Sequence, residues 1–203
     1  TYTKATYRHK YFKPISGGRF VLGFRGEIGL LEPYGDTQVA PFFEHYYSGG
    51  ISSVRGFKQN TLGPRAIPSQ YYLDNEGNPI LGQDGNPIMN PYNSYRDDRS
   101  IGGAYLVEGG FDFIFKLPFI EDQRSMRSSF FVDIGNVFSK DCGSEFTNAN
   151  CSELDFGELR YSYGVGVTWI TQLGPMSLAI AAPSNEGPFD ETENFQFEIG
   201  TQF

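Results

Sequence analysis

The strongest constraint on the fold is an alternation of apolar with polar or small residues along the chain. It is clearest between residues 161 and 169, where serine, glycine and threonine alternate with Tyr161, Tyr163, Val165, Val167 and Trp169. Successive side chains of a β-strand point to opposite faces, so this pattern indicates a strand with one apolar face. A helix would need apolar residues three and four positions apart, which the segment lacks. We therefore expect an all-β chain.

The same alternation recurs in six other segments, at residues 3–13, 20–30, 105–116, 130–135, 176–180 and 195–203. The chain thus contains about seven predicted strands, and the longer ones have roughly ten residues, the length that crosses a bilayer when tilted. No run of about 18 apolar residues is present, which excludes a transmembrane helix. Abundant glycine (25), phenylalanine (19) and tyrosine (13) also fits a β-rich chain.

Short and long connections between the predicted strands alternate along the chain. Short turns are expected at residues 14–18, 118–125 and 173–175, and long loops at 32–101, 140–158 and 183–193. Antiparallel outer-membrane barrels combine short periplasmic turns with long extracellular loops, whereas the alternative, a soluble β-sandwich, would bury its apolar face. Closed bacterial barrels have an even number of strands. An odd number with two open edges predicts a fragment of a larger transmembrane barrel.

The loop at 32–101 is far longer than the roughly 12–15 residues beyond which loops are usually functional. Its most unusual part is GGISSVRGFKQNTLGPR at residues 49–65, where one arginine stands among apolar residues. A surface turn would explain the glycines and the proline. An arginine with apolar neighbours instead favours an oppositely charged, partly desolvated partner. We predict that this loop docks through the set Val54, Arg55, Gly56 and Phe57.

These residues carry a resemblance to a known family. The pattern GGxSSVRGFxxNTLGP is similar to the sixth extracellular loop of the BamA family, which folds and inserts outer-membrane β-barrels, and residues 195–203 resemble its final strand. The resemblance implies that residues 1–203 are the C-terminal part of a sixteen-stranded barrel, with the loop at 32–101 folded into its lumen. It also implies that the family's periplasmic POTRA domains and first barrel strands lie outside this sequence.

Three carboxylates are predicted to face the lumen, namely Glu108, Asp112 and Asp133. They could form a solvated wall, or an acid–base pair with separated pKa values. A third interpretation is that Asp112 and Asp133, in the middle of neighbouring strands, anchor Arg55, because a guanidinium can bridge carboxylates. We favour this interpretation largely because the resemblance implies the same contact between loop and wall.

Cys142 and Cys151 are the only cysteines, and they flank a polar segment. This arrangement predicts a local disulfide in an oxidising compartment. A metal site is the alternative, but no histidine is near. The segment at 74–91 contains the sequence GNPI twice, which suggests a small hairpin, and its acidic residues do not have the spacing of an EF-hand. Calcium binding there is left open.

The remaining features argue against several classes of function. A net charge of −8 disfavours nucleic acid as a partner, since phosphate binding needs a basic surface. His9 and His45 lie far apart, and no hydrolase or metalloprotease motif occurs. We expect no enzymatic activity, no cofactor and no metal.

The resemblance implies a protein of the Gram-negative outer membrane that folds and inserts other β-barrel proteins. Its implied partners are unfolded barrel proteins, accessory lipoproteins of the assembly machinery and the lipid bilayer. An incoming strand would pair with the open edge of the terminal gate strand, marked by Phe195, Phe197, Ile199, Gly200 and Phe203. The alternatives are a two-partner secretion translocator of the same superfamily and a general porin.

Overall fold

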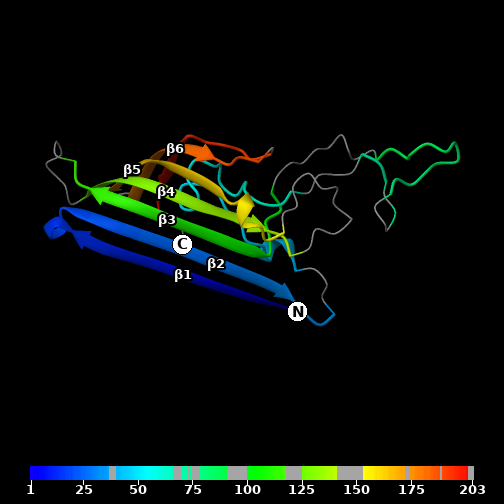
Figure 1. Cartoon of the computed structure of the whole chain (residues 1–203), viewed down its shortest axis with the longest axis horizontal. Helices are drawn as coiled ribbons and strands as arrows, with labels where there is room; N and C mark the ends of the chain where they lie inside the picture. The colour runs from blue at the N-terminus through cyan, green and yellow to red at the C-terminus, as the bar shows by residue number, and fades with distance from the viewer. Residues whose placement is uncertain are drawn as a thin grey trace.

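The computed structural model describes residues 1–36, 40–65, 70–72, 74, 78–90, 100–117, 125–140, 153–171, 174–187 and 189–200. Seven strands form one antiparallel sheet in the order β1-β2-β3-β4-β5-β6-β7, so that each strand pairs with its neighbours in sequence (Figure 1). The expected all-β fold and the number of strands are confirmed.

The strands are β1 (Tyr2–Ile15), β2 (Phe20–Pro33), β3 (Tyr105–Phe115), β4 (Met126–Phe138), β5 (Arg160–Thr171), β6 (Gly174–Ser184) and β7 (Phe195–Ile199). Among the described residues, three short 3-10 helices, η1 (Ser16–Gly18), η2 (Phe42–Glu44) and η4 (Phe156–Glu158), lie in the connections. Strand β7 has only 5 residues, whereas β1 and β2 have 14 each. Within the described ranges, no helix is long and apolar enough to cross a membrane.

The two faces of the curved sheet differ in chemistry. The convex face carries large apolar side chains that remain exposed, including Phe24, Ile28, Phe130, Val132, Tyr163, Val165, Trp169 and Ile180. The concave face carries small residues, charged residues and the apolar side chains that pack against the connection, and Asp133 is fully buried there. Because the exposed face is the apolar one, the sheet suits an apolar solvent on its convex side.

The connection between β2 and β3 runs along the concave face. Isolated bridges join Tyr46 to Gly103, Ser48 to Leu62, Arg65 to Ser100 and Phe57 to Thr192. A hairpin with bridges at Tyr71–Met89 and Leu81–Pro87 extends beyond the strand ends, as the repeated GNPI suggested (Figure 1). The connection lies between Pro33 and Tyr105, so β2 includes two residues, Glu32 and Pro33, that we had assigned to the loop at 32–101, and the connection extends three residues beyond the predicted end of that loop.

The core lies between this connection and the sheet. One cluster joins the connection to β2, β3 and β4 and contains Leu31, Ala40, Tyr46, Leu106 and Val137. A second cluster, Val54, Phe57 and Leu62, lies within the connection itself. A third joins β4 and β6 through Phe131, Ala179 and Ala181, with Ile51 packed against it. The connection therefore takes the place of a second layer.

A charge on the convex face should impair insertion into lipid. Val165 lies near the middle of β5 and is exposed on that face. We expect Val165→Lys to destabilise the inserted protein by about 2–4 kcal/mol if the position is close to the bilayer midplane. Folding into lipid vesicles, followed by denaturant titration, measures the effect, and Val165→Ile is the control. Equal stability of the lysine and isoleucine variants would contradict a lipid-facing position.

Candidate functional site

The segment at 49–65 approaches the sheet closely where Gly56 meets β6. Gly56 has a φ of 91°, in the left-handed region that favours glycine. A Cβ atom there would lie 3.0 Å from the Cβ of Ala181. Any other residue would therefore combine backbone strain with a close contact, and the preceding residue would be displaced from the wall.

That preceding residue, Arg55, is held by two carboxylates of the concave wall. Its Nε donates to Asp133 Oδ2 at 2.6 Å and its Nη2 donates to Asp133 Oδ1 at 2.9 Å. Nη2 also donates to Asp112 Oδ1 at 3.0 Å, and the backbone N–H donates to Asp133 Oδ2 at 3.2 Å. The guanidinium carbon lies 3.6 Å from the ring centroid of Phe131, which adds a cation–π contact. The structure thus brings Arg55 together with Asp112 and Asp133.

Arg25 on β2 is a second cation at the same carboxylate, which the sequence interpretation missed. Its Nη2 donates to Asp133 Oδ1 at 2.5 Å. The same side chain donates to the carbonyl oxygens of Ser52 at 3.0 Å and Ser53 at 2.8 Å. Arg25 therefore joins the wall to the backbone just before the Val-Arg-Gly-Phe motif.

The register across the sheet explains how Arg25 reaches Asp133. Arg25 pairs with Gly110 on β3, and Gly110 pairs with Asp133 on β4. The three residues form one row, and the central one has no side chain. A Cβ on Gly110 would lie 2.9 Å from both Arg25 Cγ and Asp133 Oδ1. The absence of a side chain at Gly110 therefore leaves the space through which the Arg25 side chain reaches Asp133. The signal for this contact in the sequence was an inward-facing arginine on β2, two strands away from Asp133.

Glu108 on β3 holds the first part of the segment. Its Oε1 accepts hydrogen bonds from Ser48 Oγ at 2.6 Å and from Ser53 Oγ. Ser53 Oγ also accepts from the N–H of Gly49 at 2.9 Å. Each inward carboxylate contacts donors of the segment or the wall. The contacts match the anchoring interpretation better than an acid–base pair.

The charge of Arg55 is stable against pH. Arg55 belongs to the connection and not to a strand. Burial lowers its pKa, but the hydrogen bond and charge of Asp133, followed by those of Asp112, outweigh burial and raise the pKa above its ordinary value. The arginine therefore remains charged over the working pH range of a protein.

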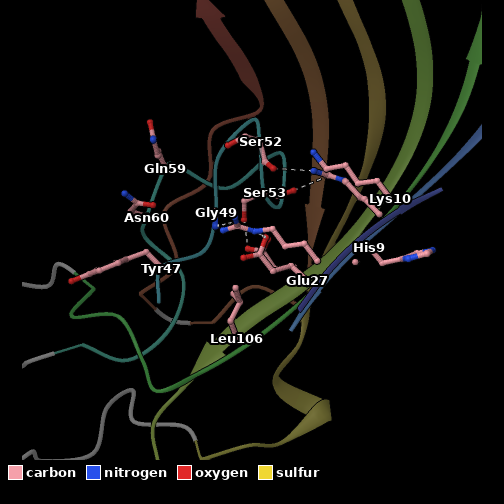
Figure 2. A pocket seen from close by; sticks show the side chains of 15 residues that line it. His9, Lys10, Glu27, Tyr47, Gly49, Ser52, Ser53, Gln59, Asn60 and Leu106 are labelled. Carbon is pink, nitrogen blue, oxygen red and sulfur yellow. Dashed lines mark hydrogen bonds and ion pairs between the residues drawn. The ribbon is translucent and has the colours of Figure 1, made fainter. Parts of the chain in front are cut away.

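A polar pocket lies beside this cluster, between β1–β3 and the segment. Figure 2 shows Gly49, Ser52 and Ser53 of the segment on one side, with Lys10 of β1 and Glu27 of β2 near the other. Arg8 closes one wall through an ion pair from its Nε to Glu27 Oε2 at 2.7 Å. Among the described residues, no group of three or more histidines, cysteines or acidic residues could hold a metal ion.

The other predicted site residues have separate locations. Val54 and Phe57 are fully buried on either side of the arginine and glycine. Phe195, Phe197 and Ile199 are exposed on β7, the last strand of the sheet, and Gly200 follows with a φ of 105°. Phe203, Cys142 and Cys151 lie outside the described residues, so the disulfide and the end of the gate strand stay predictions.

A curved antiparallel sheet with an apolar convex face and a loop docked by arginine on its concave face defines part of an outer-membrane-type β-barrel. The profile of the Omp85 superfamily domain matches residues 1–203, and the chain belongs to this superfamily. The family assignment places it in the bacterial outer membrane and agrees with the expectation that it is not an enzyme.

The chain is similar to several characterised proteins. It is 34% identical to the outer membrane protein assembly factor BamA of Neisseria meningitidis over 100% of its own length and 24% of that protein. It is 26% identical to the mouse sorting and assembly machinery component 50 homolog, over 86% of the chain and 32% of that protein. The crystal structure of Haemophilus ducreyi BamA lacking POTRA domains 1–3 matches with a TM-score of 0.71 and 27% identity, covering 97% of this chain and 34% of that one. The chain therefore spans about a quarter to a third of these relatives.

Arg55 and Asp133 should be energetically coupled. Removing either partner leaves a buried charge in an incomplete network, although Arg25 still neutralises Asp133. In a double-mutant cycle of Arg55→Ala and Asp133→Asn on the full-length protein, we expect a coupling energy of about 1–3 kcal/mol. Arg55→Lys should restore only part of it, because a point charge cannot reproduce the fork.

The control is the pair of Lys58 and Glu191, whose nitrogen and oxygen lie 2.8 Å apart and whose side chains are 59% and 37% exposed. Its coupling should be about 0–1 kcal/mol. Stability in detergent, followed by denaturant titration, gives both cycles. A coupling of Arg55 with Asp133 no larger than that of the control pair would show that the segment is held in another way.

A methyl group at Gly110 should disturb the row that contains Arg25 and Asp133. We expect Gly110→Ala to destabilise the protein by about 1–3 kcal/mol, because the added carbon overpacks the crossing arginine. Gly26→Ala is the matched control, since a Cβ there has nothing closer than a Glu108 backbone oxygen at 3.7 Å. Denaturant titration of both variants decides the point. Equal stabilities would mean that Arg25 does not depend on this space.

Proposed function

We propose that this chain is the C-terminal part of a larger outer-membrane barrel that folds and inserts other β-barrel proteins. The observation that carries the proposal is the docked arginine, because a porin wall has no need of a buried Arg55 clamped by Asp112 and Asp133. The similarity to an assembly factor supports it. The open edges of β1 and β7 support further strands that complete the barrel, with residues 1–203 as one domain.

The proposed mechanism is strand addition at β7. The N–H of Ala181 donates to Asn194 O, and the N–H of Gly200 donates to Pro175 O. In an antiparallel ladder alternate residues face alternate neighbours. Residues 195, 197 and 199 therefore direct their backbone groups to the open edge. These groups can pair with an incoming strand.

The pairing between β6 and β7 is short. Among the described residues, 5 residues of β7 are in register with β6, whereas 14 residues pair between β1 and β2. Gly200 then takes a φ of 105°, which ends the regular strand conformation. A short, easily released strand suits a gate that opens for a substrate.

The proposed partners are unfolded outer-membrane β-barrel proteins, accessory lipoproteins of the assembly machinery and the lipid bilayer. The name of the Neisseria relative, an outer membrane protein assembly factor, supports the first, and the second follows only from the family resemblance of the sequence. The exposed apolar convex face supports the third. A two-partner secretion translocator would instead act on one soluble partner, and a porin would conduct ions without any substrate.

The backbone N–H of Phe197, which points to the open edge of β7, provides a direct test of strand addition. Proline at this position removes an edge-directed N–H and leaves the neighbouring bonds to β6 in place. We expect Phe197→Pro to lower the rate of insertion of an unfolded barrel protein into liposomes at least tenfold relative to Phe197→Ala, the control for loss of the ring. The fraction of folded variant, from its heat-dependent gel mobility, normalises the rates. Equal rates for the two variants would count against strand addition at β7, and insertion undetectable even in the unmodified protein would favour a translocator or a porin.

A further inference from the structure

Gln196 links the Val-Arg-Gly-Phe motif to the edge strand. It lies on the concave side of β7, where it is 4% exposed. Its Oε1 accepts a hydrogen bond from the N–H of Gly56 at 3.1 Å, and its Nε2 donates to the carbonyl oxygen of Phe57 at 2.7 Å. One side-chain amide thus supplies the donor and the acceptor that two successive residues of the motif need.

Backbone contacts continue this pairing into the residues that precede β7. The N–H of Glu193 donates to Gly56 O at 2.8 Å, and the N–H of Lys58 donates to Glu191 O at 2.8 Å. Phe57 and Thr192 form the antiparallel bridge between these bonds. The motif therefore pairs through one antiparallel bridge with the residues just before β7, and the side chain of Gln196 extends this contact onto β7 itself.

The two attachments of the motif fall on different strands. Arg55 is bonded to Asp133 on β4 through its side chain and its backbone N–H. The very next residue, Gly56, is bonded to Gln196 on β7. Strands β5 and β6 separate β4 from β7 in the sheet. The motif consequently bridges two strands across the concave face without using the ladder between them.

We propose that Gln196 is a positioning residue that couples the docking of Arg55 to the conformation of the edge strand. If the motif leaves the wall, the buried amide loses both of its partners in the motif and keeps only the longer bond from its Nε2 to Glu193 Oε2 at 3.5 Å, and an incompletely satisfied buried amide is costly. If the start of β7 moves, Gly56 and Phe57 lose the groups that hold them beside Arg55. By thermodynamic linkage each event favours the other. The coupling goes beyond the proposed function, and only its consequence for substrate insertion rests on that function.

Hydrogen–deuterium exchange of the full-length protein in detergent tests the coupling. Gln196→Met removes both hydrogen bonds at similar volume, and we expect roughly tenfold faster exchange in residues 54–58 and in residues 193–198. Exchange in β1 and β2 should not change. Glu198→Met is the matched control: it lies on the same face of β7, and no hydrogen bond joins its side chain to the motif among the described residues.

Reciprocity is the decisive part of the test. Arg55→Lys, which loosens docking at β4, should also accelerate exchange in residues 193–198 when Gln196 is present. Combined with Gln196→Met it should add little there. Acceleration confined to residues 54–58 in Arg55→Lys, or fully additive effects, would overturn the coupling. Because Arg55→Lys leaves Gln196 intact, this arm decides the question even if the methionine variant does not fold.

The same variants separate this inference from the proposed function. Faster exchange in both segments together with normal insertion of barrel proteins supports the coupling and contradicts a role of the β7 edge in insertion. Unchanged exchange in residues 193–198 with reduced insertion overturns the coupling and leaves the proposed function standing.

Discussion

The structure depends on the fully buried carboxylate of Asp133, which lies between two guanidinium groups. A buried carboxylate costs several kcal/mol unless it is paired and its remaining lone pairs accept hydrogen bonds. Here one partner, Arg25, comes from β2 and the other, Arg55, from the connection. The carboxylate is therefore fully satisfied only when the strands have the observed register and the connection lies on the wall. Such a charge adds little net stability, but it penalises other arrangements of the same chain.

The concave face accommodates a backbone segment because its side chains are small. Gly110 lets Arg25 cross to Asp133, and Ala181 leaves room for Gly56. Many large apolar residues of the same strands point the other way and stay exposed, whereas Leu31, Leu106 and Phe131 pack on the concave side. A soluble sandwich reverses this arrangement, since its bulky face is the buried one. The residue types on the convex face of each strand thus suit lipid, whereas those on the concave face suit contact with the connection.

Local alternation was enough to predict the strands, their number and the side on which each residue lies. It also placed Asp112 and Asp133 on the inward face, whereas their contact with Arg55 was expected largely from the family resemblance. It could not identify Arg25 or Gln196 as partners, because alternation gives the face of a residue and not its neighbour across the sheet. Arg25 needs the register through Gly110, and Gln196 needs the path of a distant connection. At Gly200 the backbone has a left-handed φ of 105°, a local conformation that the alternating pattern does not reveal.

Arg55 and Gly56 are adjacent in the motif but contact different strands of the sheet. This explains why an arginine must be followed directly by a glycine. Arg55 directs a long charged side chain toward β4, where a fork can bond to Asp133 and Asp112 together. Gly56 offers only backbone, with its N–H bonded to Gln196 and its carbonyl oxygen to Glu193. A side chain on Gly56 would meet Ala181 and push the peptide away from both strands. An additional residue between Arg55 and Gly56 would move the guanidinium away from the residues that contact β7. Because the arginine and the glycine are adjacent, one short segment contacts both β4 and β7.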